Sequence, residues 1–447
     1  MQLNNPETIK NIFLKSVRTA GREAQIEIFG AFSSGTSVSW SENKLEDSLV
    51  SESCGVGLRI IKAGRMGFSY TNNFDESALD YMIASAIKHS EFLNPDKHFA
   101  FAAPLPINVG LDIFDAGFGS KSVNSKIELL KNMEAEAMTD KRIKSVLRAD
   151  YSESDGHTFI INSNGISLSS RGTVFSYGIS CVASENGETQ TGGEYSVKRK
   201  LNELDFLSIT EEAVKNAVGL LGARGIKTGG YAAVLNQNVG CEFLGLIASS
   251  FSAFSVQKNI SLLKDRKKQK IFSDILNICD DGTLAGGIAT SSFDDEGTPT
   301  QKTPLIANGV LENYLYDIYT AGIDASVSTG NAARGYSGVP EPAPSNIFIL
   351  PGSITFETLL KEMDKGIYIT ETMGMHNADP VSGEFSVGIN GFMVENGEIK
   401  YPVHGVTIAG NIMDLFNNIA GLADDLKFYA NSGSPSILIN NLSVAGN

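Results

Sequence analysis

The sequence predicts an α+β protein in which an N-terminal α/β region, with a mixed sheet and helices, precedes a larger β-rich C-terminal domain. Amphipathic helices alternate with strand-like segments in the first half, whereas the last half, from about residue 231, is rich in Gly, Ser and Thr with few long helices. A hydrophobic content of 42% with 19% charged residues is ordinary globular composition. At 447 residues the chain has room for two or three domains.

The first predicted domain, residues 1–105, combines two helices with three strands. Its second helix is predicted because apolar residues recur over residues 76–92 at the i, i+3, i+4, i+7 spacing of one buried face. A linker is predicted at residues 94–110, where three prolines interrupt both helices and sheets. The expected elements are a helix over residues 1–21, strands near 26–28, 38–40 and 57–61, and the helix over 76–92.

The second predicted domain, residues 110–225, is a β-meander between two helices, and the third, residues 226–447, follows a Gly-rich boundary. The run Asn162-Ser163-Asn164-Gly165 is typical of a hairpin turn, because Asn and Gly tolerate positive φ. The expected elements of the second domain are helices over 122–139 and 210–221 and strands at 144–151, 157–162, 166–171 and 175–184. Those of the third include a strand over 231–235 and helices over 241–254, 355–360 and 414–420.

Charge and composition exclude several classes of function. The net charge of −15 argues against general binding to nucleic acid or to anionic membranes, because both require a basic face. A basic run at residues 264–270 is interpreted as a solvated loop. The four cysteines are far apart and fit reduced thiols. The first helix lacks the apolar core of a signal peptide, and no apolar run reaches the ~18–20 residues of a membrane span. We therefore expect a cytoplasmic protein.

Spacing reveals no self-contained zinc or nucleophile motif. Helical zinc sites place two His one turn apart, but no two of the five His lie within eight residues of each other. A zinc site built from His376 and His404 with nearby carboxylates stays open. Cys241, at the start of an apolar helix, is either a thiol of lowered pKa or a small buried residue. The chain has neither a P-loop nor a GxSxG elbow.

Two polar segments of the C-terminal half are candidates for binding. The acidic triplet Asp294-Asp295-Glu296 cannot face one metal from a strand, where successive side chains alternate, so it is either a structural turn or a site. Residues 328–335, which include Asn331, form a polar loop with one fixed cation, Arg334. Such a loop either binds carboxylate or carbonyl groups or caps neighbouring elements.

At several stretches the sequence resembles the TldD/PmbA family, which is described both as modulators of DNA gyrase and as metallopeptidases. The matches are collinear from about residue 40 to the C-terminus, and together they are specific. They are Cys54–Arg59, Gly67–Thr71, Phe293–Thr300, Asn308–Leu311, Ser328–Arg334, Gly374–Ser386, Glu395–Glu398 and Thr407–Asn411.

The resemblance also indicates which kind of family member this chain is similar to. TldD-like members carry an HExxxH zinc motif on a helix that follows a strand of the C-terminal domain, with a further Cys ligand near the C-terminus. Here that strand, Tyr231–Leu235, and the following helix look preserved, but residues 245–250 read Gly-Leu-Ile-Ala-Ser-Ser and the tail at 431–436 lacks the Cys. Such side chains cannot hold Zn²⁺ or deprotonate its water. The chain therefore resembles the PmbA (TldE) type.

The resemblance implies a heterodimer in which a TldD-like subunit supplies Zn²⁺, and this chain, which holds none itself, completes a protease of peptides and unfolded segments that also matures some ribosomal peptide toxins. Residues expected to line the shared cavity are His376, Asp295, Glu296, Asn331 and Arg334. One alternative is a modulator of DNA gyrase or of toxin–antitoxin systems that acts by binding alone. Another is an independent metallopeptidase with a site around His376 and His404. A homodimer is possible when the partner is absent.

Overall fold

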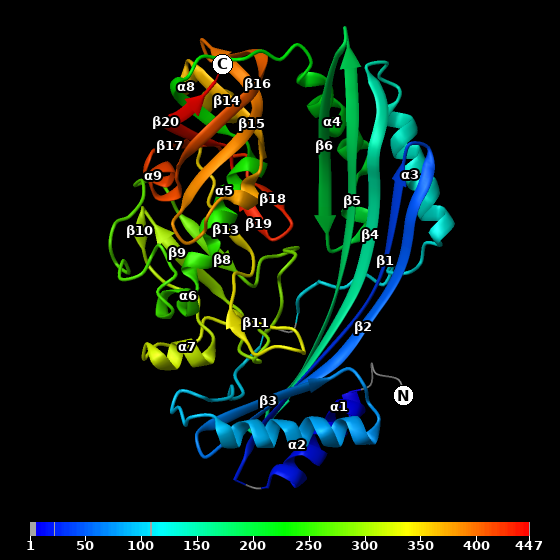
Figure 1. The fold of residues 1–447 in the computed structure, drawn as a ribbon, viewed down its shortest axis with the longest axis vertical. Coiled ribbons are helices and arrows are strands. Elements are labelled where there is room, and N and C mark those ends of the chain that lie inside the picture. The colour runs from blue at the N-terminus through cyan, green and yellow to red at the C-terminus, as the bar shows by residue number, and fades with distance from the viewer. Residues whose placement is uncertain (1–5, 22, 108–109, 447) are drawn as a thin grey trace.

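A sheet of six strands, most of them long, forms the N-terminal half of the molecule, and a β-rich C-terminal domain stands beside it (Figure 1). This arrangement comes from a computed structural model that describes residues 6–21, 23–107 and 110–446. Among these residues, no helix combines the length and the hydrophobicity required to span a bilayer. Helices and large sheets occur together along the chain, so the predicted α+β class is confirmed.

The N-terminal sheet is antiparallel at every pairing between its described strands, whereas a mixed sheet was expected. Hairpins join most of the neighbouring strands, and β4 returns from the helical segment to pair antiparallel with β1. The sheet therefore runs across the predicted division at residues 105–110. Its order is β3-β2-β1-β4-β5-β6, and the strands are β1 (Gln25–Ser41), β2 (Lys44–Lys62), β3 (Arg65–Thr71), β4 (Ile143–Asn162), β5 (Ser167–Glu185) and β6 (Glu188–Lys198).

Four helices cover one face of this sheet. Side chains alternate along a strand, so the even-numbered residues Ile26, Ile28, Val38 and Trp40 of β1 are buried beneath helices, while Glu27 points to the opposite face. The expected helix over residues 76–92 has these bounds in the structure. The helices are α1 (Pro6–Ala20), α2 (Glu76–Phe92), α3 (Val123–Ala137) and α4 (Phe206–Gly219), with a short 3-10 turn η1 (Leu201–Glu203); residues 1–5 of the first predicted helix lie outside the described part.

The β-meander has fewer and longer strands than the sequence suggests. Residues 144–151 and 157–162 were expected as two strands and form the single strand β4, and the pair 166–171 and 175–184 likewise forms β5. Buried and less buried residues alternate through the middle of β5, so mid-strand polar residues face outward instead of turning the chain. The predicted turn between these strands is confirmed, with Gly165 at φ 99° and its N–H donating to Asn162 O at 3.2 Å.

Two sheets and a central helix build the C-terminal domain. One has the order β16-β15-β14-β7-β20-β17, and a further β16–β20 pairing closes five of its strands into a ring; the other has the order β10-β9-β8-β13-β19-β18, and β11 pairs with β12. The strands are β7 (Gly229–Leu235), β8 (Ile278–Asp281), β9 (Lys302–Ala307), β10 (Val310–Leu311), β11 (Ala332–Ala333), β12 (Glu341–Pro342), β13 (Ile347–Ile349), β14 (Gly366–Met373), β15 (Glu384–Glu395), β16 (Glu398–Asn411), β17 (Ile419–Leu422), β18 (Lys427–Tyr429), β19 (Ser432–Ser434) and β20 (Ile437–Ala445).

The central helix is α5, and its side chains Val239, Phe243 and Ile247 enter the large core that both C-terminal sheets share. The helix expected over residues 241–254 is interrupted, because Ser252 is extended and donates its hydroxyl to Pro342 O at 3.0 Å. The helical elements are α5 (Gln237–Ala248), η2 (Ser249–Phe251), α6 (Ala253–Gln257), α7 (Ile318–Ile323), α8 (Phe356–Met363), η3 (Met375–Asn377) and α9 (Ile412–Asn417).

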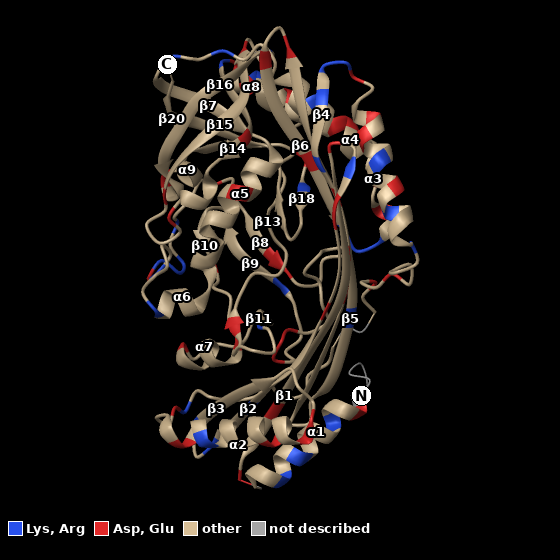
Figure 2. Cartoon of the chain, turned by 45° about the vertical axis from the view of Figure 1, so that its right-hand side comes forward, with Lys and Arg blue, Asp and Glu red and all other residues tan. Residues whose placement is uncertain are grey.

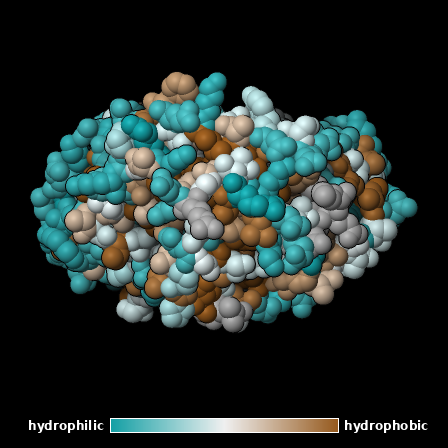
Figure 3. Space-filling model, turned by 90° about the horizontal axis from the view of Figure 1, so that it is seen from below, coloured by the Kyte–Doolittle hydropathy of each residue, from teal (hydrophilic) through white to brown (hydrophobic). Residues whose placement is uncertain are grey.

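Charged residues of both signs, and apolar and polar residues, are intermixed over the surface of the described residues. Acidic and basic residues are interspersed along α1, α2, α3 and α4 (Figure 2). Seen from below, hydrophobic residues reach the surface in several places among hydrophilic ones (Figure 3). Scattered exposed apolar residues are normal on a protein surface.

Candidate functional site

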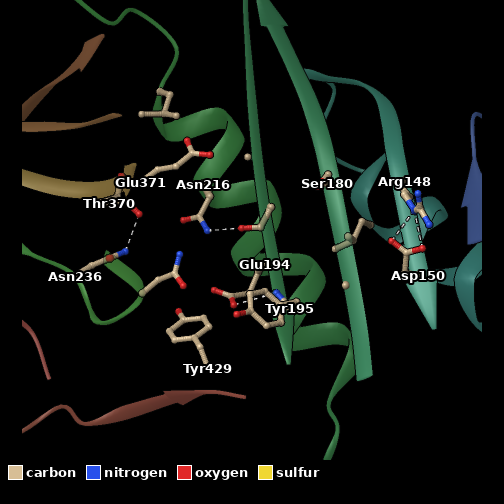
Figure 4. Close-up of a pocket in the computed structure, with 16 residues that line it drawn as sticks. Arg148, Asp150, Ser180, Glu194, Tyr195, Asn216, Asn236, Thr370, Glu371 and Tyr429 are labelled. Atoms are coloured by element: carbon tan, nitrogen blue, oxygen red, sulfur yellow. Dashed lines mark hydrogen bonds and ion pairs between the residues drawn. The ribbon is translucent and has the colours of Figure 1, made fainter. Parts of the chain in front are cut away.

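A cavity of about 400 Å³ lies between the N-terminal sheet and the C-terminal domain (Figure 4). Strands β4 to β6 and helix α4 form one wall, and the start of α5 with β14 and β18 forms the other. β6 is the last strand of its sheet, and its residues 192–195 line the cavity. Polar side chains dominate the lining, and those labelled in Figure 4 are Arg148, Asp150, Ser180, Glu194, Tyr195, Asn216, Asn236, Thr370, Glu371 and Tyr429.

Side-chain amides hold the two walls in place. Asn236 accepts a hydrogen bond from Val239 N at 2.8 Å, which caps α5, and donates to Thr370 O of β14 at 2.9 Å. On the opposite wall, Asn216 of α4 donates to Gly193 O of β6 at 3.0 Å. The start of α5 and the strand across from it are therefore fixed by neutral hydrogen-bonding groups that reach the cavity.

The two walls touch where β6 meets β18. Lys427 lies 3.3 Å from a carboxylate oxygen of Glu194, and the rings of Tyr195 and Tyr429 are 5.4 Å apart. Burial raises the pKa of Tyr429, so this phenol stays neutral. The cavity is thus bounded by an ion pair and an aromatic pair that both join the sheet to the C-terminal domain.

Residues 245–250, where the resemblance places a zinc motif, span the end of α5 and the 3-10 turn η2 and carry no imidazole, thiolate or carboxylate. Gly245 is exposed, and a Cβ built on it would meet nothing within 4 Å. Leu246 is buried in the C-terminal core, and the buried Ser250 accepts a hydrogen bond from Leu262 N at 3.3 Å. Hydrogen, alkyl and hydroxyl groups do not fit a zinc ion, which requires imidazole, thiolate or carboxylate.

The cysteine of α5 is a buried thiol. The Cys241 thiol donates to Ser432 O at 3.3 Å, and burial raises the pKa of Cys241 to about 12. Of the two interpretations of this residue, the thiol of lowered pKa is therefore wrong. The cause is the packing of the start of α5 against β19, since desolvation outweighs any benefit from the helix N-terminus.

Four of the five residues expected to line a shared cavity gather in the contact between β1, β2 and the C-terminal domain. We call this contact the interdomain joint and define it by Glu27, Arg59, Asp294–Glu296 and Asn331–Arg334. Asp295, Glu296 and Arg334 meet there, and Asn331 lies at its edge, donating to Asp280 Oδ2 at 2.7 Å. None of the five expected residues is among the described residues that line the 400 Å³ cavity.

A buried ion network forms the centre of the interdomain joint. Glu27 and Arg59 are directly opposite each other on β1 and β2, and Arg59 Nη2 lies 2.7 Å from Glu27 Oε1 and 3.0 Å from Glu296 Oε1. Arg334 Nη2 contacts the same Glu27 oxygen at 2.7 Å. The four side chains are between 0% and 5% exposed, so this is a salt bridge isolated from water.

Backbone donors organise the acidic triplet as a turn. The Asp294 carboxylate accepts hydrogen bonds from the N–H groups of Glu296 and Thr298, both at 2.9 Å, and of Ala332 at 3.1 Å. Asp295 accepts from Arg334 N at 2.8 Å, which ties the turn to the 328–335 loop. The structural turn, one of the two interpretations of the triplet, is what the structure contains.

Burial dominates the electrostatics of the interdomain joint. It raises the pKa of Asp294 well above its usual range, with the Glu296 carboxylate adding to the effect, and it raises the pKa values of Asp295 and Glu296 as well. Burial also lowers the pKa of Arg334. For Arg59, burial acts to lower the pKa, but the charges of Glu27 and Glu296 outweigh it and raise the pKa.

The raised pKa of Asp294 predicts a pH-dependent contribution to stability. A carboxyl whose pKa is higher in the folded state binds its proton more tightly there, so its contribution is complete below the usual value of 3.8 and is lost as the pH rises. The Asp294→Asn variant cannot titrate at this position. We expect the free energy of unfolding of the wild type, minus that of the variant, to decrease above about pH 4, by up to about 1.4 kcal/mol per pH unit.

Urea unfolding of both proteins between about pH 4.5 and pH 8 measures this difference. The variant keeps an oxygen for two of the three N–H donors, so a constant offset from the lost third acceptor is expected at every pH. A difference that stays flat or grows with pH would contradict the prediction.

The two histidines of the alternative zinc site are both exposed. His376 lies on η3 and His404 on β16, and neither reaches the interdomain joint or lines the cavity. Among the described residues, no three His, Cys, Asp or Glu side chains are grouped so that they could hold a metal ion. The structure therefore brings together the acidic turn and Arg334, but not His376.

The sequence matches three family domains described under the name PmbA/TldA metallopeptidase. These are domain 1 over residues 26–90, the central domain over residues 117–221 and the C-terminal domain over residues 228–446. The chain belongs to the PmbA/TldD family. Together the three matches cover most of the chain and include both the cavity and the interdomain joint.

Individual relatives extend over nearly the whole chain. A protein of Methanocaldococcus jannaschii is 34% identical over 86% of this chain and 88% of its own length. The metalloprotease PmbA homolog of Haemophilus influenzae is 27% identical over 96% of this chain and 93% of its own. A crystal structure from Thermotoga maritima, described as a modulator of a DNA gyrase, is 27% identical and superposes with a TM-score of 0.90 over 98% of this chain and 99% of that one.

Three of the stretches that resemble the PmbA/TldD family, Cys54–Arg59, Phe293–Thr300 and Ser328–Arg334, meet at the interdomain joint. Gly55 and Gly57 of β2 lie beneath Tyr336, and Arg59 of the same stretch pairs with Glu296. Glu27 and Arg59 are the members of the ion network that were not among the predicted site residues, although Arg59 ends one of the stretches that carry the resemblance. The sequence also holds a signal for Glu27. Its signal is a charged residue between Ile26 and Ile28, on the strand face opposite the helices.

Proposed function

We propose that this chain is the zinc-less partner subunit of a PmbA/TldD-type metalloprotease heterodimer that acts in the cytoplasm on peptides and unfolded segments. One observation carries the proposal: α5 begins beside the cavity, but Gly245 and Ser250, at the positions where the resemblance places zinc ligands, offer no ligating group. In this assignment a TldD-like subunit supplies Zn²⁺ and the general base. No step of peptide hydrolysis is assigned to a residue of this chain.

The cavity supports a role in holding substrate. Its walls offer amide and hydroxyl groups from Asn236, Asn238, Asn216 and Ser180, which can bond to a peptide main chain whatever its sequence. Residues 192–195 belong to a strand at the end of its sheet, and an extended peptide can add to such a strand through main-chain hydrogen bonds. Recognition through the main chain suits unfolded substrates of varied sequence.

The proposal is tested by purifying this chain and a TldD-like protein with the HExxxH motif from the same organism. Light scattering after size exclusion gives the mass of each protein alone and of the mixture, and a fluorogenic unfolded substrate reports hydrolysis. We expect a heterodimer, hydrolysis that is far greater in the mixture than in either protein alone, and loss of hydrolysis with a chelator. A mixture with no complex and no gain in hydrolysis would sink the proposal.

The same assay separates the alternatives. Stoichiometric zinc and chelator-sensitive hydrolysis in this chain alone would point to an independent metallopeptidase around His376 and His404. A second candidate function, binding without proteolysis, is favoured by the Thermotoga maritima structure described as a modulator of a DNA gyrase. Complex formation with gyrase that persists in a chelator would support that function, and the net charge of −15 indicates that contact with protein rather than DNA would carry it.

A further inference from the structure

One half of β2 is an exposed sheet edge. All ten residues of 44–53, which we call the β2 edge, are exposed. β1 pairs with this segment on one side, but β3 pairs only with residues 56–62, so no described strand covers the other side. In an antiparallel pair, alternate N–H and C=O groups point away from the partner strand. The β2 edge therefore offers a row of main-chain groups to another strand.

Apolar side chains lie on both faces of the β2 edge. Leu49 is 54% exposed and Val50 is 67% exposed, and successive residues of a strand point to opposite faces. On β1, Ser37 pairs with Leu49 and Thr36 pairs with Val50, and both partners are too small to cover these apolar side chains. A long edge with exposed apolar residues on both faces is a typical surface for pairing with another chain.

The charges of the β2 edge decide which chain fits it. It carries the carboxylates Glu46, Asp47 and Glu52 and only one cation, Lys44. Two copies of this edge paired antiparallel would place carboxylates opposite or diagonal to each other, and like charges so placed are destabilising. Self-pairing is therefore disfavoured, and a strand with basic residues is favoured.

We propose that the β2 edge binds an extended strand of the zinc-bearing partner subunit, with basic residues facing Glu46, Asp47 and Glu52 and apolar residues over Leu49 and Val50. This assignment rests on the proposed heterodimer, since it names the surface on which that partner binds. The edge lies on the side of the sheet away from the C-terminal domain (Figure 1), so a strand added there leaves the cavity beside α5 open.

The test compares partner binding by wild type with that by a Leu49→Lys/Val50→Lys variant. A matched control is Tyr81→Lys/Val327→Lys, because these residues are 76% and 78% exposed and lie outside the β2 edge. Dissociation constants for the zinc-bearing subunit are measured by calorimetry at low and high salt. We expect the edge variant to bind at least about tenfold more weakly, the control to bind like wild type, and wild-type binding to weaken as salt rises.

Hydrogen exchange of the wild type gives a readout that needs no variant. Amide exchange over residues 44–53 is expected to slow when the zinc-bearing subunit is added. Unchanged exchange together with wild-type affinity of the edge variant would overturn the inference while leaving the heterodimer intact. Protection of residues 44–53 in this chain alone, rising with its concentration, would show self-pairing and also overturn it. Absence of any wild-type complex would remove both the inference and the proposed function.

Discussion

Replacing Arg59 with Met is expected to lower the free energy of unfolding by about 3–5 kcal/mol, because one partner of a buried ion network is removed while the others stay buried. Arg59 contacts Glu27 and Glu296, whose side chains are 0% and 1% exposed. Arg334 remains to pair with Glu27, but Glu296 loses its cation, and among the described residues the N–H of Ile318 at 2.8 Å is the donor that it keeps. A desolvated carboxylate without a counter-charge is the source of the loss.

Arg171→Met is the matched control for this substitution. Arg171 also pairs with a carboxylate, Asp155 at 2.6 Å. Its guanidinium lies over the Phe114 ring, as that of Arg59 lies over the Phe101 ring, but the Arg171 side chain is 49% exposed. We expect a loss below about 1 kcal/mol, as for other surface pairs. Urea unfolding of wild type and both variants measures the two losses. Equal losses would show that water reaches the interdomain joint and that its ion network contributes no more than a surface pair.

Local pattern is enough to predict some elements of this fold and not others. The bounds of α2, Glu76–Phe92, follow from one apolar stripe, and the hairpin after Asn162 follows from residues that tolerate positive φ. Strand length does not follow in the same way. Residues 152–156 interrupt the apolar pattern of β4 and resemble a turn, yet the strand continues because it pairs with β1 and β5 on both sides. Pairing partners distant in sequence decide that outcome.

The same distinction applies to the candidate site. Alternation along β1 and β2 places Glu27 and Arg59 on the face opposite Ile26 and Ile28, and this much is readable from the sequence. The partner of Arg59 at the other side of the interdomain joint is Glu296, which is 237 residues away. Nothing in one sequence sets that contact. The acidic turn and the Arg334 loop could therefore be singled out, whereas their role in holding two halves of the chain together required the structure.

The position of the cavity was the less predictable part of the site. Its walls come from strands β4 to β6 and from α5, and its lining is rich in neutral polar residues such as Asn216 and Asn236. Neutral amides carry little signal in a sequence, because they also cap helices and close turns, as Asn236 does here. Titratable and ligating residues therefore point to the interdomain joint, whereas the amides of the cavity give no such signal.

A methyl group added at Gly57 should separate the two halves of the interdomain joint. A Cβ on Gly57 would lie 2.4 Å from Tyr336 O, and one on the neighbouring Gly55 would lie 2.3 Å from the Tyr336 ring. The Tyr336 carbonyl belongs to the backbone of the loop that carries Arg334, so it can yield only if the loop moves. We expect Gly57→Ala to lower the free energy of unfolding by about 1–3 kcal/mol, the usual cost of overpacking a tight contact.

Gly156→Ala is the control, because Gly156 is also a strand glycine but is exposed, and a Cβ there would meet only Gly172 O at 4.0 Å. We expect this change to stay within about 0.5 kcal/mol of wild type. Hydrogen exchange locates the effect, since Arg334 N–H is bonded to Asp295 in the native loop and should exchange faster in Gly57→Ala alone. If Gly57→Ala loses stability without faster exchange at Arg334, then β2 rather than the 328–335 loop has shifted to relieve the contact. That result would contradict the prediction that the loop moves.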